Sequence, residues 1–391
     1  MNNLCVDVGY ASLNKYGEYL CGDHVETVTQ GELSSIFVLA DGLGSGVKAN
    51  ILSTLTAKII STMLASSLDV EDCVTTVAAT LPICNVRQLA YSTFTIIRVS
   101  DNLDAELIQF DNPHIILLRD GKNFDYLTTS EVIDGKMIYK AKIQLREDDT
   151  FIAFSDGAVH AGIGFTLNFG WGREQIIDYM VSKYKPVFSA KTLSSMLVGA
   201  CNDLYGEKPG DDTTVGALKI RRRQTVNLLF GPPAFPEDAN KMMALFFGKQ
   251  GKYIVCGGTT STIAAGYLNK ELNVSAPHYI DPEIPPIAAI EGVDLVTEGV
   301  KTMTRVLEYA QDFSAGNKRY KEWWNKEDGA SLIARLLFEE ATDINFYVGK
   351  AINPAHPSHT LPSGLSIKMH LAETLSDCLR QMGKKIKISY F

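Results

Sequence analysis

The sequence of 391 residues predicts an α+β fold in two parts, an N-terminal domain over residues 1–220 and a C-terminal α/β domain over residues 221–391. In the first part, strand-like runs follow one another across short turns and helical runs come in pairs, which is typical of antiparallel sheets with helices outside them. In the second part, strands and helices alternate, which is typical of a mostly parallel sheet. The chain is also too long for one ordinary core.

The composition is that of a folded protein and argues against several classes of function. Hydrophobic residues make up 46% of the chain, charged residues make up 21%, and the net charge is -8. This balance argues against nucleic-acid binding and gives no reason to expect a membrane partner, and no apolar stretch approaches the roughly 20 residues of a membrane helix. The N-terminus lacks the basic and apolar regions of a signal peptide. The seven cysteines are scattered singly, so we expect reduced thiols and a cytoplasmic protein.

In the N-terminal domain, β-branched and aromatic runs alternate with turn residues. Turns this close together predict an antiparallel meander for residues 91–127, because a parallel crossover needs a dozen or more residues. The predicted strands are 26–29, 35–39, 91–99, 107–110, 115–118, 124–127, 137–144, 151–154 and a run ending at Ile220. The predicted helices are 47–64, 69–81, 173–183 and 190–204, and the apolar stripe of the first is Ile51, Leu55, Ile59 and Met63.

In the C-terminal domain, apolar strands alternate with helical patterns after a basic joint at residues 221–223. The predicted strands are 226–230, 253–256, 294–296, 344–348 and 386–390, and the predicted helices are 236–247, 259–268, 300–313, 329–341 and 365–382. Trp323 and Trp324 are predicted to pack on the core from a helix edge.

Three acidic segments stand at strand ends in the N-terminal domain. They are Asp41-Gly42-Leu43-Gly44-Ser45-Gly46, Phe154-Ser155-Asp156-Gly157 and Gly210-Asp211-Asp212-Thr213-Thr214-Val215. A carboxylate at the end of a strand is held rigidly, and a neighbouring glycine lets a ligand approach. Rigid oxygen ligands suit Mg²⁺ or Mn²⁺. A single Asp-Gly after a strand is more often a simple turn, so on the residues alone a metal site and a set of ordinary turns both remain open.

The glycines after Asp41 could alternatively be interpreted as the glycine-rich motif of a dinucleotide-binding site. Their spacing is shorter than that motif requires, and Thr62 stands where a ribose-binding acid is expected. The carboxylate of Asp41 would in addition repel a pyrophosphate. These three departures argue against a dinucleotide site.

The same three segments resemble the signature elements of the metal-dependent PPM (type-2C) serine/threonine protein phosphatases. The Asp-Gly-x-Gly-x-Gly and Asp-Asp-x-Thr-Val forms are most similar to the bacterial branch typified by the stage-II sporulation E phosphatase. Gly22-Asp23-His24 resembles that branch's upstream Gly-Asp element, and Asp111-Asn112-Pro113-His114 resembles its central hairpin. The resemblance covers about residues 1–220 and implies an αββα sandwich of two antiparallel sheets flanked by helices.

The resemblance implies a site that holds two or more divalent cations, Mn²⁺ or Mg²⁺. It implies that Asp41 bridges two of them, that the Gly42 carbonyl binds one, and that Asp156 and Asp211 hold the second. Asp23 would act through bound water or a further metal. The implied activity is hydrolysis of a phosphoserine or phosphothreonine on a regulatory protein by a metal-bridging hydroxide, without a phosphoenzyme.

Two departures from the family bear on this expectation. Leu43 stands where eukaryotic members carry a histidine, which leaves His24 or a metal-bound water to protonate the leaving group. The arginine that clamps phosphate in many members has no counterpart that the sequence identifies. The alternative function is a signalling module that binds a partner protein without turnover, and a homodimer stays open as a further partner.

The C-terminal domain resembles no family, and its role is expected to be regulatory or ligand-sensing. Gly257, Gly258, Thr259, Thr260 and Ser261 stand at a predicted helix N-terminus, where free N–H groups favour an anion. A simply capped helix is the other interpretation. The loops 231–233, 297–299 and 349–354 also follow apolar strands, so in a parallel sheet all four loops lie at the carboxyl edge. We therefore expect a small anionic ligand, such as a nucleotide, at this edge.

Overall fold

The computed structural model describes residues 3–31, 33–80, 92–274, 284–317, 319–351 and 367–391. The chain forms two compact units, Met1–Arg222 (unit 1) and Arg223–Phe391 (unit 2), each with its own hydrophobic core. Within the described ranges, no helix is both long enough and apolar enough to cross a membrane.

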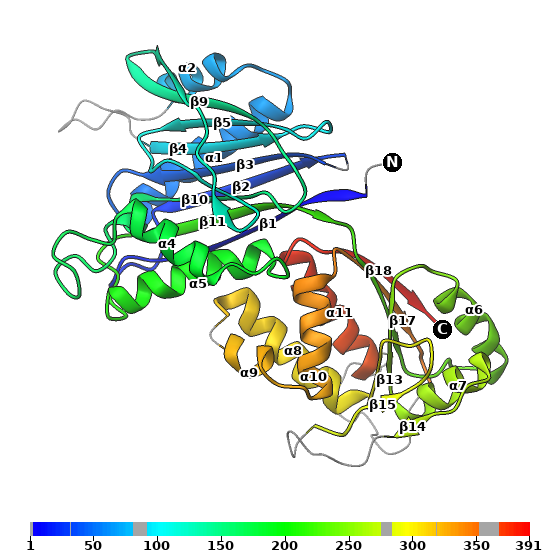
Figure 1. Ribbon diagram of the computed structural model, residues 1–391. Helices are drawn as coiled ribbons and strands as arrows, with labels where there is room; N and C mark the ends of the chain where they lie inside the picture. The colour runs from blue at the N-terminus through cyan, green and yellow to red at the C-terminus, as the bar shows by residue number, and fades with distance from the viewer. Residues whose placement is uncertain (1–2, 32, 81–91, 275–283, 318, 352–366) are drawn as a thin grey trace. The chain divides into compact units, whose positions relative to one another are not determined.

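Unit 1 contains two antiparallel sheets (Figure 1). The six-stranded sheet has the order β2 (Asp23–Gln30), β3 (Ser34–Gly42), β4 (Ser92–Val99), β5 (Asp104–Phe110), β9 (Lys136–Gln144), β8 (Thr129–Ile133). The five-stranded sheet has the order β1 (Leu4–Leu13), β11 (Thr213–Arg222), β10 (Thr150–Phe154), β6 (Ile116–Arg119), β7 (Lys122–Asn123). The predicted antiparallel α+β architecture is confirmed.

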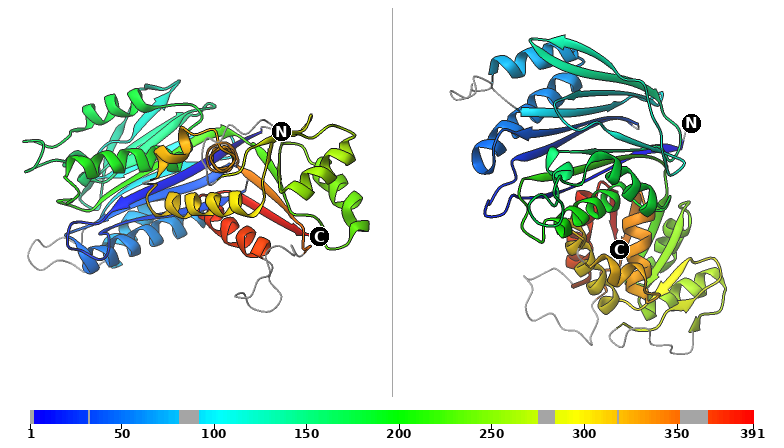
Figure 2. Two further views of the ribbon diagram at one scale, coloured as in Figure 1. Left: turned by 90° about the horizontal axis from the view of Figure 1, so that it is seen from below. Right: turned by 60° about the vertical axis from the view of Figure 1, so that its left-hand side comes forward.

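Helices cover the outer faces of both sheets of unit 1, as Figure 2 shows. They are α1 (Gly46–Ala65) and α2 (Val70–Thr80) on the six-stranded sheet, and α4 (Arg173–Lys183) and α5 (Ala190–Leu204) on the other side. Residues 36–40 of β3 are all apolar because this part of the strand is buried on both faces. Phe37 and Leu39 join the core between the sheets, whereas Ile36 and Val38 pack under the helices.

Two details of unit 1 differ from the sequence prediction. Residues 124–127 form no strand, and β6 belongs to the second sheet, so the predicted meander is interrupted after β5. The chain leaves the first sheet at Asp111, whose φ of 54° and following Asn-Pro turn are incompatible with a continuing ladder.

The apolar stripe predicted for α1 was wrong. Ile51 and Leu55 are 51% and 43% exposed. The buried face is made mostly of small residues: Gly46, Ala49, Ser53, Thr56, Ala57, Ile60, Ser61 and Leu64. Small side chains let α1 approach the strand ends closely, since a Cβ added at Gly42 would lie 2.0 Å from the Ala49 carbonyl oxygen.

Unit 2 is an α/β domain with a mostly parallel sheet, as predicted. Its order is β14 (Asn273–Val274), β15 (Ala288–Ala289), β16 (Leu295–Thr297), β13 (Lys252–Cys256), β12 (Thr225–Phe230), β17 (Asp343–Val348), β18 (Lys385–Tyr390). The strands from β16 to β18 run parallel, and β14 and β15 add an antiparallel edge.

Helices lie on both faces of this sheet, so its central strands are apolar on both sides. One face packs on α8 (Val300–Ala315), α10 (Gly329–Ala334) and α11 (Ile367–Gln381), and the other on α6 (Ala239–Phe247) and α7 (Gly258–Leu268). The structure adds a short helix, α9 (Tyr320–Trp324), in which Trp323 is fully buried, so its predicted packing on the core is confirmed.

The ends of two predicted helices in unit 2 need correction. The helix predicted over 236–247 begins with a 3-10 turn, Pro236–Asp238, and the helix predicted over 329–341 ends in a π-helical turn, Arg335–Glu340. The start of the helix predicted from residue 365, and residues 352–354 of the predicted loop, lie outside the described residues.

Candidate metal centre

Four strand ends bring acidic residues to one end of the unit 1 sandwich. Asp23 begins β2 and lies opposite Asp41 near the end of β3. Asp156 follows the end of β10, and Asp211 and Asp212 precede β11, which pairs with β10. The predicted residues Asp23, Asp41, Asp156 and Asp211 therefore come from the two different sheets to one place.

Ser155 connects the two sheets at this end. Its Oγ donates a 2.7 Å hydrogen bond to Asp23 Oδ2 and accepts a 2.9 Å hydrogen bond from the Thr214 N–H. The backbone N–H of Ser155 donates to the Thr214 carbonyl at 2.9 Å. These hydrogen bonds hold Oδ2 of Asp23 in place, and Asp23 is only 4% exposed.

Glycines let the acidic loops close over one another. A Cβ added at Gly22 would lie 2.7 Å from Asp212 Oδ2, and one added at Gly157 would lie 2.1 Å from the Asp212 carbonyl oxygen. Gly42, a predicted metal ligand through its carbonyl, ends β3 opposite Ser92. Any side chain at these three positions would push the loops apart.

Burial and neighbouring charges raise the pKa values of three aspartates in the cluster. Burial raises the pKa of Asp41 most, and the charges of Asp23, Asp156 and Asp211 raise it further. Burial also raises the pKa of Asp23, against the hydrogen bond from Ser155, which lowers it. The pKa of Asp211 is raised by burial first and then by Asp156. The ionised form of these carboxylates is therefore destabilised in the fold, and a bound cation would stabilise it.

The donor chemistry fits a hard divalent cation. Asp23 Oδ1 and Asp212 Oδ2 are buried and lack a hydrogen-bond partner among the described residues. In the same ranges, no group of three or more Asp, Glu, His or Cys side chains is arranged to hold a metal ion. Mg²⁺ usually keeps several waters and takes only one or two carboxylates, so three protein side chains around one ion are not required.

Two residues that the sequence analysis did not predict, Lys15 and His160, also border the acidic cluster. Lys15 Nζ lies 4.0 Å from Asp211 Oδ1, and the Lys15 N–H donates a 3.0 Å bond to Asp212 Oδ1. His160 Nδ1 lies 3.8 Å from Asp156 Oδ2, one helical turn away. The four-residue spacing could have identified His160, whereas the approach of Lys15 depends on contacts remote in sequence.

His24, expected as a donor to the leaving group, lies on the wrong side of its strand. Neighbouring side chains in a strand point to opposite faces, so His24 turns away from the face of Asp23. Its Nε2 lies 3.5 Å from Glu26, which also pairs with Lys58 of α1. Thus His24 faces the α1 layer, and His160 is the histidine that borders the cluster.

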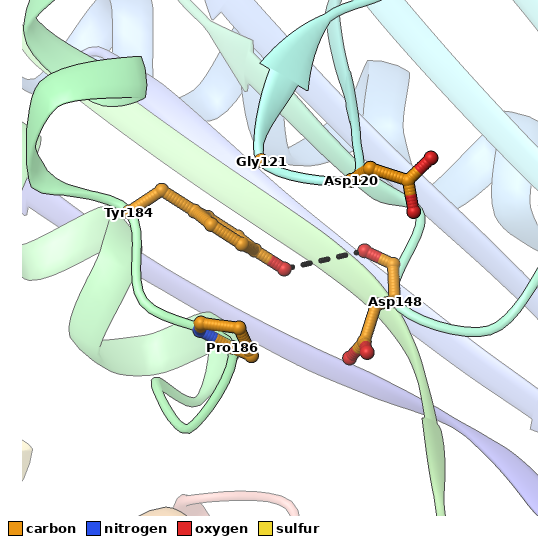
Figure 3. Close-up of a pocket in the computed structure, with 5 residues that line it drawn as sticks. All are labelled: Asp120, Gly121, Asp148, Tyr184 and Pro186. Atoms are coloured by element: carbon orange, nitrogen blue, oxygen red, sulfur yellow. Dashed lines mark hydrogen bonds between the residues drawn. The ribbon is translucent and has the colours of Figure 1, made fainter.

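A separate hollow of about 440 Å³ lies elsewhere on unit 1 (Figure 3). It is lined by Asp120, Gly121, Asp148, Tyr184 and Pro186, and the Tyr184 hydroxyl donates to the Asp148 carbonyl at 3.3 Å. Asp148 precedes β10 whereas Asp156 follows it, so the hollow is at the opposite end of this strand from the acidic cluster.

Unit 2 brings the predicted ligand residues to the N-terminus of α7. Gly257 is the N-cap residue with a φ of 114°, and no side chain caps the helix. The Ser261 hydroxyl donates back to the Gly257 carbonyl at 2.9 Å. Thr260 Oγ1 is buried and has no hydrogen-bond partner among the described residues.

Comparison with known families finds a family model that matches most of unit 1. Residues 32–221, just under half of the chain, match the family model described as stage II sporulation protein E (SpoIIE). The resemblance expected from the motifs is confirmed over this range. A search of curated proteins finds no match to the chain.

Three solved structures illustrate what part of the chain is similar to. The SpoIIE phosphatase domain with a fragment of its regulatory domain, from Bacillus subtilis, is 19% identical with a TM-score of 0.48, covering 56% of this chain and 62% of that one. The RsbU and RsbW domains of a Mycobacterium tuberculosis protein are 16% identical with a TM-score of 0.48, covering 61% and 68%. RsbX in complex with magnesium is 20% identical with a TM-score of 0.40, covering 55% and 95%.

Proposed function

We propose that unit 1 is a metal-dependent protein phosphatase that hydrolyses phosphoserine or phosphothreonine on a regulatory protein. The observation that carries the proposal is the acidic cluster, in which carboxylates from two sheets meet and the pKa values of Asp23, Asp41 and Asp211 are raised by burial and by neighbouring carboxylates. A fold that needed no cation would gain stability by losing these charges, because buried unpaired charges are costly.

In this function Asp41, Asp156 and Asp211 hold the cations, and the Gly42 carbonyl and Asp23 complete the donor set. A pair of Mn²⁺ or Mg²⁺ ions, when bound, supplies an activated water and neutralises charge on the phosphoryl group. The protein positions these donors rigidly, since the Ser155 hydroxyl and the close glycine contacts leave the loops little freedom.

Lys15 and His160 fill the two roles for which the sequence identified no definite residue, binding of the substrate phosphate and protonation of the leaving group. The Lys15 ammonium, at the exposed margin of the cluster beside Asp211, binds a phosphoryl oxygen of the substrate. The His160 imidazole holds a proton at the Asp156 side and gives it to the departing serine or threonine oxygen. Both side chains are partly exposed, as a site that receives a protein substrate requires.

A protein substrate is supported by the apolar residues that α1 exposes beside the Asp41 loop. Val47, Ile51 and Leu55 are 61%, 51% and 43% exposed and follow one another at one-turn intervals. Contiguous exposed apolar side chains favour docking of a partner. They also suit the alternative function, a module that binds a partner without turnover.

Hydrolysis of p-nitrophenyl phosphate separates the two functions. A phosphatase should turn over this substrate with Mn²⁺, stop in EDTA, and lose at least about a hundredfold in rate in Asp41→Asn. Equal rates for wild type and Asp41→Asn in every condition would favour the binding module. Regulation of this activity by unit 2 belongs to the same proposal and is supported by their covalent linkage in one chain.

A further inference from the structure

The carboxyl edge of the unit 2 sheet carries a row of glycines. The last residues of four strands lie side by side: Val348, Phe230, Cys256 and Thr297. The backbone N–H of the residue after each of three strands donates to the last carbonyl of the neighbouring strand. These hydrogen bonds run from Gly349 to the Phe230 carbonyl at 3.0 Å, from Gly231 to the Cys256 carbonyl at 3.4 Å, and from Gly257 to the Thr297 carbonyl at 2.9 Å. The residues that directly follow β17, β12 and β13 are therefore glycines, which contribute no side chains to this edge.

The direction in which the chain adds strands to the sheet reverses at this row of glycines. The chain passes from β12 to β13 and β16 on one side, and then returns to β17 and β18 on the other side of β12. In doubly wound sheets, the crevice above such a reversal is where ligands bind. The reversal in unit 2 falls between β12 and β17, above Gly231 and Gly349.

Lys368, in the first turn of α11, brings a positive charge to this point. A Cβ added at Gly231 would lie 2.7 Å from its Nζ, and Gly231 has a φ of 85°. The residue is only 7% exposed, and within the described residues its ammonium donates one hydrogen bond, 2.7 Å to the Ala351 carbonyl. No carboxylate pairs with it in the described ranges, and the sequence between Gly349 and Lys368 contains no Asp or Glu.

A buried ammonium without a counter-charge is costly to the fold, and lysine is almost never fully buried unless paired. Burial accordingly lowers the pKa of Lys368. The Ala351 carbonyl satisfies one of its three donors. The two remaining donors and the unbalanced charge are what an anionic group would satisfy.

A second unsatisfied group lies along the same row. Thr260, in the first turn of α7, is 1% exposed, and its Oγ1 has no hydrogen-bond partner in the described part of the chain. This hydroxyl is directed at the strand end, since a Cβ added at Gly257 would lie 3.1 Å from it. The uncapped N–H groups of the same turn point in the same direction.

The far end of the row has the opposite charge. Glu298 follows β16 and accepts a 2.9 Å bond from the Gly299 N–H, and its Oε1 lies 3.8 Å from a Cβ added at Gly258. The edge therefore offers a cation above β12 and β17, and a carboxylate beside β13 and β16.

We propose that this edge binds a small molecule that carries a phosphate or carboxylate group, with the Lys368 ammonium as the counter-charge of that group. The Thr260 hydroxyl contacts the same molecule, and Glu298 accepts a hydrogen bond from one of its hydroxyl or amino groups. The site is independent of the unit 1 activity and needs no metal ion.

Binding to the full-length chain in EDTA tests this proposal, because EDTA removes metal-dependent anion binding by unit 1. The probes are inorganic phosphate, ribose 5-phosphate and adenosine 5′-monophosphate for the phosphate class, and citrate and glutamate for the carboxylate class. We expect calorimetry to detect saturable binding of one class. Lys368→Met should weaken it at least about tenfold, the loss typical of a charge-assisted hydrogen bond.

Matched variants distinguish the site from a general charge effect. Lys270→Met removes a lysine that is exposed and paired with Glu291 at 2.7 Å, and it should bind as wild type does. Thr260→Val, which removes only the unpartnered hydroxyl, should weaken binding. Glu298→Gln should weaken probes with hydroxyl or amino groups and leave inorganic phosphate unaffected.

The ligand-free stability of Lys368→Met gives a second readout. Because the substitution removes an uncompensated buried charge, the variant should unfold at the same or a higher temperature than wild type. The proposal is overturned if no probe binds, if Lys368→Met binds as wild type does, or if it melts lower while Thr260→Val binds normally.

Discussion

Asp23 and Asp41 lie directly opposite each other on the antiparallel strands β2 and β3. Such partners have Cβ atoms about 4.5–5.5 Å apart, and like charges at this distance destabilise a sheet. Here the second sheet adds Asp156 and Asp211, whose charges also raise the pKa of Asp41. Without bound metal ions, repulsion among these aspartates therefore destabilises the folded state of unit 1.

The stability of the metal-free protein should fall as the pH rises above about 4, the pKa of an unfolded aspartate. Raised pKa values mean that the folded state binds more protons than the unfolded state does, so stability is fully present below the unfolded pKa and decreases towards the folded one. Melting temperatures in EDTA between pH 5 and 8 measure this effect. Saturating Mn²⁺ should reverse the slope, because protons and metal compete.

Asp41→Asn provides the control for this pH dependence. In EDTA the variant should melt above wild type at pH 8, by roughly 2–4 °C for each kcal/mol of repulsion removed. The exposed residue Glu174, changed to Gln, should leave the slope unaltered. A wild-type melting temperature that rises with pH in EDTA, with the same slope in Asp41→Asn, would refute the electrostatic account.

Ser155→Ala should destabilise unit 1 by about 1–3 kcal/mol, because it leaves the buried Asp23 carboxylate and the Thr214 N–H without their shared partner. Urea unfolding measures the loss. Ser182, whose exposed hydroxyl donates to the Tyr179 carbonyl of its own helix, is the matched control and should change by less than about 0.5 kcal/mol on substitution by alanine. Equal losses in the two variants would contradict the role given to Ser155.

Two glycine substitutions should have opposite effects. Gly42→Ala introduces a Cβ 2.0 Å from the Ala49 carbonyl, so α1 must shift and the Asp41 loop with it. We expect a loss of more than about 2 kcal/mol. Gly199→Ala in α5 meets no atom within 4 Å and should stabilise by about 0.5–1 kcal/mol. Thermal unfolding compares them, and a Gly42→Ala variant as stable as wild type would contradict the close contact.

His160→Asn should reveal the proton donor through the leaving group. Serine is a poor leaving group and needs the proton, whereas p-nitrophenolate leaves without one. We expect kcat for a phosphoserine peptide to fall about 100-fold or more and kcat for p-nitrophenyl phosphate to change little. A similar fall for both substrates would assign His160 to the support of Asp156 instead.

The sequence predicts what is local in this protein. The apolar run of β3 and the Asp-Gly turn after it are contiguous, and the antiparallel and parallel parts follow from short turns and from alternation. The buried face of α1 could not be predicted, because close approach at Gly42 favours small residues that carry no hydrophobic signal. The Ser155–Asp23 bond joins residues 132 positions apart, and Lys368 reaches Gly231 only through the packing of α11.

Calorimetric titration with Mn²⁺ tests the central claim most directly. The wild-type chain should bind about two ions with release of protons, because the carboxylates with raised pKa values must ionise. Asp41→Asn and Asp156→Asn should each lose at least one ion, and Glu174→Gln should bind as wild type does. Identical Mn²⁺ binding in wild type and both aspartate variants, or none in any of them, would contradict the account of unit 1.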